Sequence, residues 1–322
     1  MMVDAATLNH NLQEAIKNKL PKGVNISNVL ADILFIGKEA IYRRLRGEVP
    51  FSFQEAALIA KNLGISLDSL ILASNNRNPL YELIVQRYHD LDESDYKAFE
   101  EYLDLLKVVS KEKKSEQVFT SNLFPTFPSN QYYLFGKYSA FRSMYINQEI
   151  NTIKTFQELT YPERLYNLSK AIIEETKNIK KTVYIWDSTV FESIVKEIKY
   201  FRNIRLMDDK DISEFKIELH KILNYLEELA SKGKFENGNK VQFYISNINS
   251  DTTYSYLETD TVHLSMIGAF AMNYVVSLET ESLQRMKNRI HSLKRVSTLI
   301  SESGEIQRIQ FFKTQHEHID NL

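Results

Sequence analysis

The sequence predicts a mixed fold, with an all-α N-terminal domain, a helical connector and an α+β or α/β C-terminal domain. Up to about residue 74, apolar residues recur at spacings of three and four, which is the period of helices. After residue 131, short β-branched and aromatic runs alternate with helical segments. The chain has 322 residues, a length that predicts two or three domains.

Composition limits the classes of function that can be considered. The net charge is -2, so any surface that attracts nucleic acid must be local. The sequence has no cysteine, which excludes disulfides, cysteine-ligated zinc and thiol nucleophiles. No apolar run approaches the roughly 18 residues of a membrane span, and the N-terminus lacks a signal-peptide core. We therefore expect a cytoplasmic protein that does not enter a membrane.

The N-terminal domain is expected to span residues 1–74. Apolar periodicity predicts its helices, and Pro21, Gly47 and Gly64 end three of them. The helices are expected over 7–20, from a cap at Ser27, over 37–45, over 53–63 and over 66–72. The polar stretch 74–78 before Pro79 then predicts a linker.

Residues 79–117 are expected to form a helical connector with a break near 90–94. Its second helix carries an apolar stripe at spacings of three and four, which is typical of a buried or dimerising face. The stripe consists of Tyr96, Phe99, Leu103, Leu106 and Val109.

The C-terminal domain is expected over residues 131–322. Buried strands are predicted at 182–186, 203–207, 241–246, 254–258, 261–266 and 269–276. Helices are predicted over 160–178, between the strand at 182–186 and residue 201, over 279–293 and from residue 303 onward. Asp211 and Glu214 are expected to cap a further long helix.

Two parts of the N-terminal domain carry a specific sequence pattern. The first comprises Leu30-Ala31-Asp32 followed by Ile36, Ile41 and Gly47, and the second comprises residues 58–66 (LIAKNLGIS) followed by Leu67 and Leu70. This pattern closely resembles the helix-turn-helix domain of Cro-type (XRE-family) repressors over about the first 72 residues. The resemblance implies a regulator of transcription that binds double-stranded DNA at specific sequences.

The third helix is the element that would meet DNA. Its apolar residues would fix its inner face, and its outer face would carry Lys38, Glu39, Tyr42, Arg43 and Arg46. A helix fits the major groove and reaches base edges with such side chains. Between residues 38 and 46 the four basic residues and one acidic residue give a local charge of +3, which would attract phosphate.

The resemblance also assigns roles to single residues. It places Lys38, Glu39, Tyr42 and Arg43 on the groove-facing surface. It also places Ser27 at a DNA phosphate, and Arg46 beside the glycine turn, where contacts to the backbone are common. This chain departs from the family in the turn before the third helix. Phe35 stands where the family usually has glycine, and Gly37 stands where a small hydroxyl residue often opens the helix.

Two other interpretations of this domain remain open at this point. A small helical bundle can carry a charged face that is only solvated. The domain could also keep the fold and bind a protein instead of DNA.

No catalytic motif is visible in residues 79–322, so we expect no enzyme activity, cofactor or metal site. His316 and His318 lie two apart on a predicted helix and do not share a face. Asp208, Asp209 and Asp211 are read as a turn and a helix cap rather than a cation site. Aromatic residues on the predicted strands could line a ligand pocket or simply form the sheet core. The candidate pocket residues are Tyr184, Trp186, Tyr244, Tyr254 and Tyr256.

Two hypotheses of function follow. The first is a regulator that forms a homodimer or a higher homo-oligomer and whose C-terminal domain senses an unknown small-molecule effector or mediates oligomerisation. The alternative is a ligand-binding protein or enzyme in which the helix-turn-helix only targets or autoregulates. Strand-helix alternation between 182 and 246 motivates the alternative, because such sheets bind ligands at strand ends.

Overall fold

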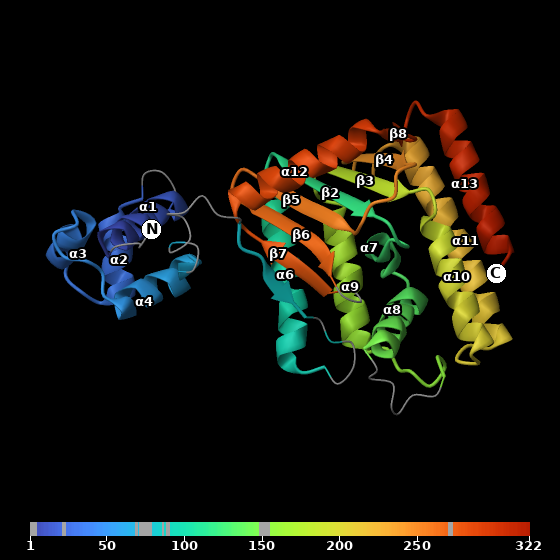
Figure 1. The fold of residues 1–322 in the computed structure, drawn as a ribbon, viewed down its shortest axis with the longest axis horizontal. Helices are drawn as coiled ribbons and strands as arrows, with labels where there is room; N and C mark the ends of the chain where they lie inside the picture. The colour runs from blue at the N-terminus through green and yellow to red at the C-terminus, as the bar shows by residue number, and fades with distance from the viewer. Residues whose placement is uncertain are drawn as a thin grey trace. The chain divides into compact units, whose positions relative to one another are not determined.

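The computed structural model describes residues 5–20, 24–67, 70, 79–85, 87, 91–147, 155–269 and 273–322 (Figure 1). The chain divides into two compact units, Met1–Leu80 and Tyr81–Leu322, called here the N-terminal and C-terminal units. The first is helical, whereas the second combines helices with a mixed sheet. The mixed fold predicted from the sequence is thus confirmed.

The N-terminal unit packs short helices around a small apolar core. The helices are α1 (Ala5–Lys19), α2 (Ile26–Leu34), α3 (Lys38–Leu45) and α4 (Phe53–Leu63). Their core consists of Leu12, Ile16, Leu30, Leu34, Ile41, Ile59, Ala60, Ile65 and Leu70. Gly47 and Gly64 have positive φ angles and lie just beyond α3 and α4, as helix-ending glycines should. The expected helix at 66–72 lies largely, and the linker at 74–78 entirely, outside the described residues.

The C-terminal unit is built on an eight-stranded sheet in the order β1-β7-β6-β5-β2-β3-β4-β8. Strands β2, β3 and β4 are parallel to one another at its centre, and the flanking strands are antiparallel. The strands are β1 (Glu82–Ile84), β2 (Ser115–Ser121), β3 (Lys181–Asp187), β4 (Lys240–Ser246), β5 (Tyr254–Thr259), β6 (His263–Ala269), β7 (Asn273–Ser277) and β8 (Ser297–Leu299).

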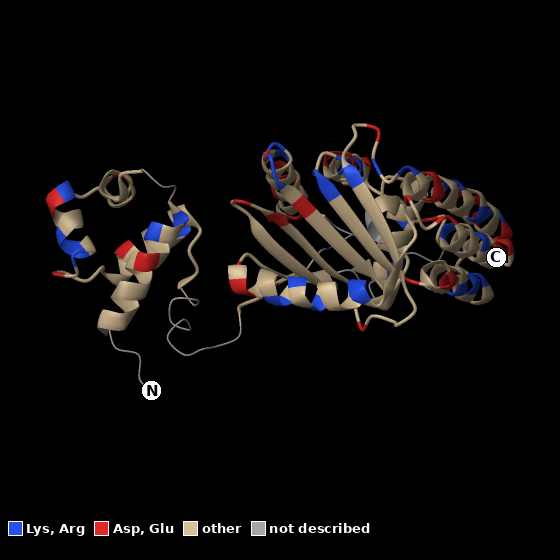
Figure 2. Ribbon diagram, turned by 90° about the horizontal axis from the view of Figure 1, so that it is seen from above, with Lys and Arg blue, Asp and Glu red and all other residues tan. Residues whose placement is uncertain are grey.

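Helices cover both faces of this sheet unequally (Figures 1 and 2). One face packs against most of the helices, and α12 crosses the other. The helices are α6 (Glu93–Val109), α7 (Thr126–Ser129), α8 (Tyr133–Ile146), α9 (Glu163–Thr176), α10 (Val190–Asn203), α11 (Asp209–Lys232), α12 (Thr280–Arg295) and α13 (Glu305–Asp320). Apolar cores therefore lie on both sides of the sheet, two clusters on the face with most of the helices and one under α12.

Residues 79–117 differ from the helical connector expected from the sequence. They form β1, α6 and the start of β2, which all belong to the C-terminal unit. The apolar stripe of α6 is used inside this unit, because Leu103, Leu106 and Val109 are buried against α9 and the sheet residues Leu257 and Leu264. These three residues of the stripe are thus used for packing within one chain.

Two further differences lie between α10 and α11. The strand expected at 203–207 is instead a turn, in which Arg205 has a φ of 60°. Asp208 rather than Asp211 is the N-cap of α11, and Asp211 completes its capping box. Among the described residues, no helix has the length and apolar character needed to cross a membrane.

Candidate nucleic-acid interface

A tight turn joins α2 to α3. The backbone N–H of Phe35 donates to the Ala31 carbonyl oxygen, and Phe35 adopts the left-handed conformation with φ 54° and ψ 38°. Few residues other than glycine adopt this conformation at a helix end. The resemblance to Cro-type repressors places a glycine here, so this chain keeps the turn conformation although the residue is phenylalanine. The Phe35 side chain is 91% exposed.

The inner face of α3 is fixed by packing. Ile41 is fully buried and contacts the cluster that includes Leu30 and Leu34 of α2. Leu45 packs at the edge of the same cluster. Because an apolar residue at mid-helix points into the core, the residues on the opposite side of α3 must face solvent.

The outward side chains of α3 form one exposed surface, called here the α3 surface. It consists of Lys38, Glu39, Tyr42, Arg43 and Arg46. The exposed fractions of the Glu39, Arg43 and Arg46 side chains are 81%, 55% and 56%. Figure 2 shows basic and acidic residues together on this helix. The structure thus brings five of the six candidate DNA-binding residues onto one accessible face.

Ser27 is the sixth candidate, and the structure does not favour a phosphate contact by its side chain. Ser27 is 2% exposed, and Asn25 rather than Ser27 is the N-cap of α2. The Ser27 hydroxyl donates to Asn25 Oδ1 at 2.6 Å and lies 3.1 Å from the Tyr42 hydroxyl. Ser27 therefore orients Tyr42 from within the fold. The asparagine just before the helix is a sequence signal for this cap.

Arg44 is removed from the exposed charge by an ion pair inside the unit. Its guanidinium lies 2.7 Å from a Glu55 oxygen and donates to the Ala40 carbonyl oxygen at 3.1 Å. Glu55 also accepts from the backbone N–H of Ser52 in a capping box. Burial raises the pKa of Glu55, but the bonds from Arg44 and Ser52 outweigh it and the pKa is lowered. The sequence pattern Ser-x-x-Glu at 52–55 is the signal for this arrangement.

Glu48 reduces the positive charge further. It lies 2.7 Å from Arg46 and 3.5 Å from Arg43, and the hydrogen bond from Arg46 lowers its pKa. Arg46 also lies 3.7 Å from Glu39. The exposed charges are therefore three cations, on Lys38, Arg43 and Arg46, and two carboxylates, on Glu39 and Glu48. The local excess of positive charge is smaller than the +3 that the sequence indicates for residues 38–46. Glu48 was missed because it follows the glycine that ends the helix.

The aromatic residues proposed as a ligand pocket do not come together. Tyr184 and Trp186 are buried on the sheet face that packs against α10 and α11. Tyr244, Tyr254 and Tyr256 belong to the core on the opposite face, under α12. Because side chains alternate along a strand, the strand register divides the set between two faces. The prediction of one pocket lined by all five residues is therefore wrong.

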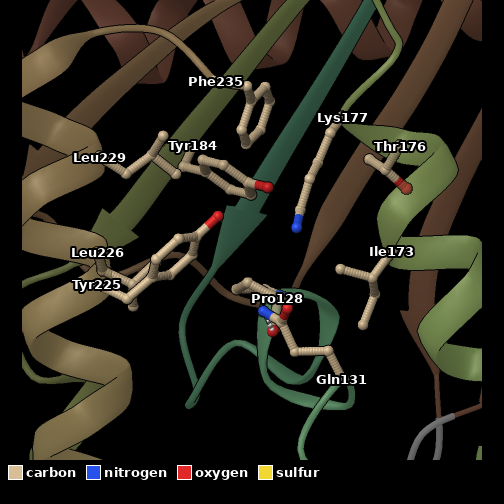
Figure 3. Close-up of a pocket in the computed structure, with 10 residues that line it drawn as sticks. All are labelled: Pro128, Gln131, Ile173, Thr176, Lys177, Tyr184, Tyr225, Leu226, Leu229 and Phe235. Atoms are coloured by element: carbon tan, nitrogen blue, oxygen red, sulfur yellow. Dashed lines mark hydrogen bonds between the residues drawn. The ribbon is translucent and has the colours of Figure 1, made fainter. Parts of the chain in front are cut away.

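Two small cavities nevertheless touch members of this set. The hydroxyls of Tyr184 and Tyr225 and the Lys177 ammonium point into a cavity of about 10 Å³, which is room for about one water molecule (Figure 3). A separate cleft of about 160 Å³ beside α12 is lined in part by Tyr254 and Arg289. The first volume is far below that of an ordinary ligand pocket, and the second is about half of the smallest usual value of about 300 Å³.

Several ionisable groups of the C-terminal unit have structural partners. Asp187 accepts from the backbone N–H and the hydroxyl of Ser250 at 2.9 and 3.3 Å, and burial raises its pKa. His220 and His316 lie with their Nδ1 atoms 2.8 Å apart, and His220 Nε2 lies 3.2 Å from Asp320. In the part of the chain that the structure describes, no three His, Asp or Glu side chains form a group that could hold a metal ion.

Comparison of the chain with protein-family models, with curated proteins and with solved structures found no match.

Proposed function

We propose that this protein is a sequence-specific DNA-binding regulator of transcription, and that the α3 surface enters the major groove of double-stranded DNA. The observation that carries the proposal is the pairing of a tight left-handed turn at Phe35 with a third helix whose inner face is fixed by Ile41. A short helix held in this way presents a rigid row of outward side chains, which is what groove recognition needs.

The exposed residues of the α3 surface have the chemistry for both base and phosphate contacts. Arg43 can donate two hydrogen bonds to the major-groove edge of guanine, and Lys38 in the first turn can reach a guanine or a phosphate. Among the described residues, no carboxylate forms an ion pair with Lys38. Tyr42, held by Ser27, adds a hydroxyl whose position is fixed before DNA arrives.

The modest positive charge of the α3 surface supports binding as a homodimer. The pairs of Glu48 with Arg43 and Arg46 are exposed and contribute little, so phosphate groups can replace them. One copy of the surface would still bind weakly. Two copies related by a twofold axis would contact two half-sites about 10 base pairs apart and roughly double the interface. The C-terminal unit would then supply the dimer contact or sense an effector.

The proposal is tested with full-length protein and a duplex that carries its selected binding site. Arg43→Ala and Lys38→Ala are compared with wild type by fluorescence anisotropy. Lys61→Ala is the matched control, because Lys61 is an exposed lysine of α4, away from the α3 surface. We expect Arg43→Ala to cost about 1–3 kcal/mol, which is roughly 5- to 150-fold in affinity. Unchanged specific binding in both variants would contradict this assignment.

A further inference from the structure

Helix α12 carries the largest positive charge of the described helices. Its sixteen residues include five lysines and arginines, Arg285, Lys287, Arg289, Lys294 and Arg295, and one acidic residue, Glu281. Helix α3 has three basic residues and one acidic residue. The whole chain is slightly acidic, so this concentration of cations on one helix is local. Figure 2 shows basic residues repeated along α12.

Two of the five cations hold α12 to the sheet. Lys287 lies 2.6 Å from a Glu258 oxygen, and the Lys294 ammonium lies 4.5 Å from the centre of the Tyr244 ring. Both lysine side chains are half-buried. They attach the helix to strands β4 and β5.

The three arginines lie on the outer face of the helix. Leu283, Met286 and Ile290 are buried against the sheet, which directs the opposite side of α12 to solvent. The exposed residues on that side are Glu281, Gln284, Arg285, Asn288, Arg289, His291, Ser292 and Arg295, called here the α12 surface. Apart from Glu281 at its N-terminal end, each of these side chains can donate a hydrogen bond and none carries a negative charge.

The carboxylates near the α12 surface hold its arginines only weakly. Arg285 lies 2.7 Å from Glu281 and Arg289 lies 3.5 Å from Asp251. The exposed fractions of these two arginine side chains are 55% and 61%. Exposed pairs of this kind contribute little, so an anion with several charges can displace the carboxylates. Arg289 and Ser292 also lie at the cleft of about 160 Å³ beside the helix, whose other lining residues are mostly apolar.

We propose that the α12 surface is a second DNA-contact surface, which binds phosphate groups without reading base sequence. The inference rests on the proposed function of the α3 surface. Arg285 and Arg295 are ten residues apart, so the arginines extend over about 15 Å of helix, a length over which a duplex presents several phosphates. Arginine, asparagine, glutamine and serine are among the side chains that contact phosphate and sugar.

Two features favour DNA over other anionic partners. A membrane-binding helix needs a row of large apolar side chains next to its basic ones, whereas the α12 surface has none between residues 284 and 295 and is followed by a single exposed one, Val296. The same chain is proposed to hold DNA through its N-terminal unit, so a neighbouring stretch of backbone is present at high effective concentration. A non-specific contact in the C-terminal unit would also compensate for the small charge excess of the α3 surface.

The test uses full-length protein, a duplex with the selected site and a duplex of equal length without it. Affinity is measured over a series of sodium chloride concentrations. The triple variant Arg285→Gln, Arg289→Gln and Arg295→Gln is compared with a control triple variant of equal charge loss, Lys196→Gln, Lys210→Gln and Lys221→Gln. These control lysines are exposed residues of α10 and α11 and form similar helical ion pairs.

We expect the α12 variant to bind both duplexes more weakly by the same factor, about tenfold or more at low salt. The slope of log affinity against log salt should fall by about one for each arginine that contacts a phosphate. The control variant should keep the affinity and slope of wild type. Urea unfolding followed by the fluorescence of Trp186 checks that the C-terminal unit remains folded. If the triple variant unfolds, Arg295→Glu alone should show the same direction of change.

The outcomes separate this inference from the proposed function. Equal affinity and slope in the α12 variant and its control, with operator preference still lost in Arg43→Ala, would overturn the inference and leave the proposed function standing. Failure of wild type to bind either duplex would overturn both. Wild-type binding to phosphatidylserine vesicles that the α12 variant loses, with DNA affinity unchanged, would assign the surface to a membrane and also overturn the inference.

Discussion

The two units place their distinctive side chains differently. In the N-terminal unit, Lys38 and Arg43 lie outside a small core, on a helix whose rotation is set by the buried Ile41. In the C-terminal unit, Tyr184 and Trp186 lie inside a large core, with exposed fractions of 4% and 0%. Residue type alone therefore does not indicate a binding site. Charged residues on the solvent side of a helix stay accessible, whereas aromatic residues on central strands are used for packing.

The first way to test this contrast is to add one methyl group in each unit. A Cβ atom at Gly136 of α8 would lie 2.5 Å from the ring of the buried Tyr161, whereas a Cβ atom at Gly37 would meet nothing within 4 Å. We expect Gly136→Ala to destabilise the C-terminal unit by about 2–3 kcal/mol, although alanine is the better helix former. Urea unfolding followed by Trp186 fluorescence measures this change.

Gly37→Ala is the matched substitution in the N-terminal unit. The φ of Gly37 is -64°, which alanine adopts without strain. We expect a change within about 0.5 kcal/mol, measured by amide hydrogen exchange of α3. If Gly37→Ala and Gly136→Ala destabilised their units equally, the start of α3 would be packed as tightly as the core around α8, which would contradict the contrast between the two units.

The second prediction compares neighbouring arginines of α3. Arg44→Ala breaks the pair with the largely buried Glu55 and should destabilise the N-terminal unit by about 2 kcal/mol. Arg43→Ala should change stability by less than about 0.5 kcal/mol, because its side chain is exposed. Hydrogen exchange of the α2–α4 amides measures stability, and anisotropy measures DNA affinity. Weakened DNA binding by Arg43→Ala without loss of stability separates a contact residue from a structural one.

The Arg44–Glu55 pair also has a predictable pH dependence. The pKa of Glu55 is lowered in the folded state, so its contribution is fully present above the unfolded value of about 4.3 and is lost as pH falls through the folded pKa. Wild-type N-terminal unit should therefore lose stability faster than Glu55→Gln on acidification. Parallel pH profiles for the two proteins would contradict this interpretation of the pair.

The third prediction concerns the turn before α3. Phe35 has a left-handed backbone and is almost fully exposed, so its side chain contributes little burial to offset the strain. We expect Phe35→Gly to stabilise the N-terminal unit by about 1 kcal/mol. Hydrogen exchange of α2 and α3 measures the gain. A loss of stability would mean that the exposed ring contributes to the fold after all.

The smallest expected effect is electrostatic and lies between α11 and α13. Burial and the neighbouring His220 lower the pKa of His316, while Glu227 and Asp320 act in the opposite direction. Stability is therefore greatest above the unfolded histidine pKa of about 6.5 and falls as pH drops below it, since the unfolded state binds the proton more tightly. His316→Gln should flatten the pH dependence of Trp186-detected unfolding between about pH 7 and 5. If His316→Gln and wild type had the same pH dependence of unfolding, His316 would not be the source of this loss of stability.

The local pattern predicted much of the N-terminal unit. Helices α1 to α4, the glycine ends at Gly47 and Gly64 and the outward residues of α3 all follow from apolar period and capping chemistry. The ion pair of Glu48 with Arg43 could not be predicted in the same way, because it depends on how the chain turns after the helix. The charge of an exposed surface therefore needs the structure as well as the sequence.

The C-terminal unit was less predictable because its arrangement depends on long-range pairing. Most strands were expected close to their observed positions, but local sequence does not reveal that Phe119 pairs with Tyr184 while Val118 pairs with Tyr256. This register places Tyr184 and Tyr256 on opposite faces. Helix α8 has almost no amphipathic pattern, since it is buried on several sides, and so it was not expected.

Selection of bound sequences from a random pool of double-stranded DNA by the full-length protein tests the central claim most directly. We expect enrichment of one motif, arranged as two half-sites about 10 base pairs apart, and loss of that motif in the variant with Lys38→Ala and Arg43→Ala. Recovery of a pool no different from the input, or the same motif with wild type and variant, would contradict recognition of DNA by the α3 surface.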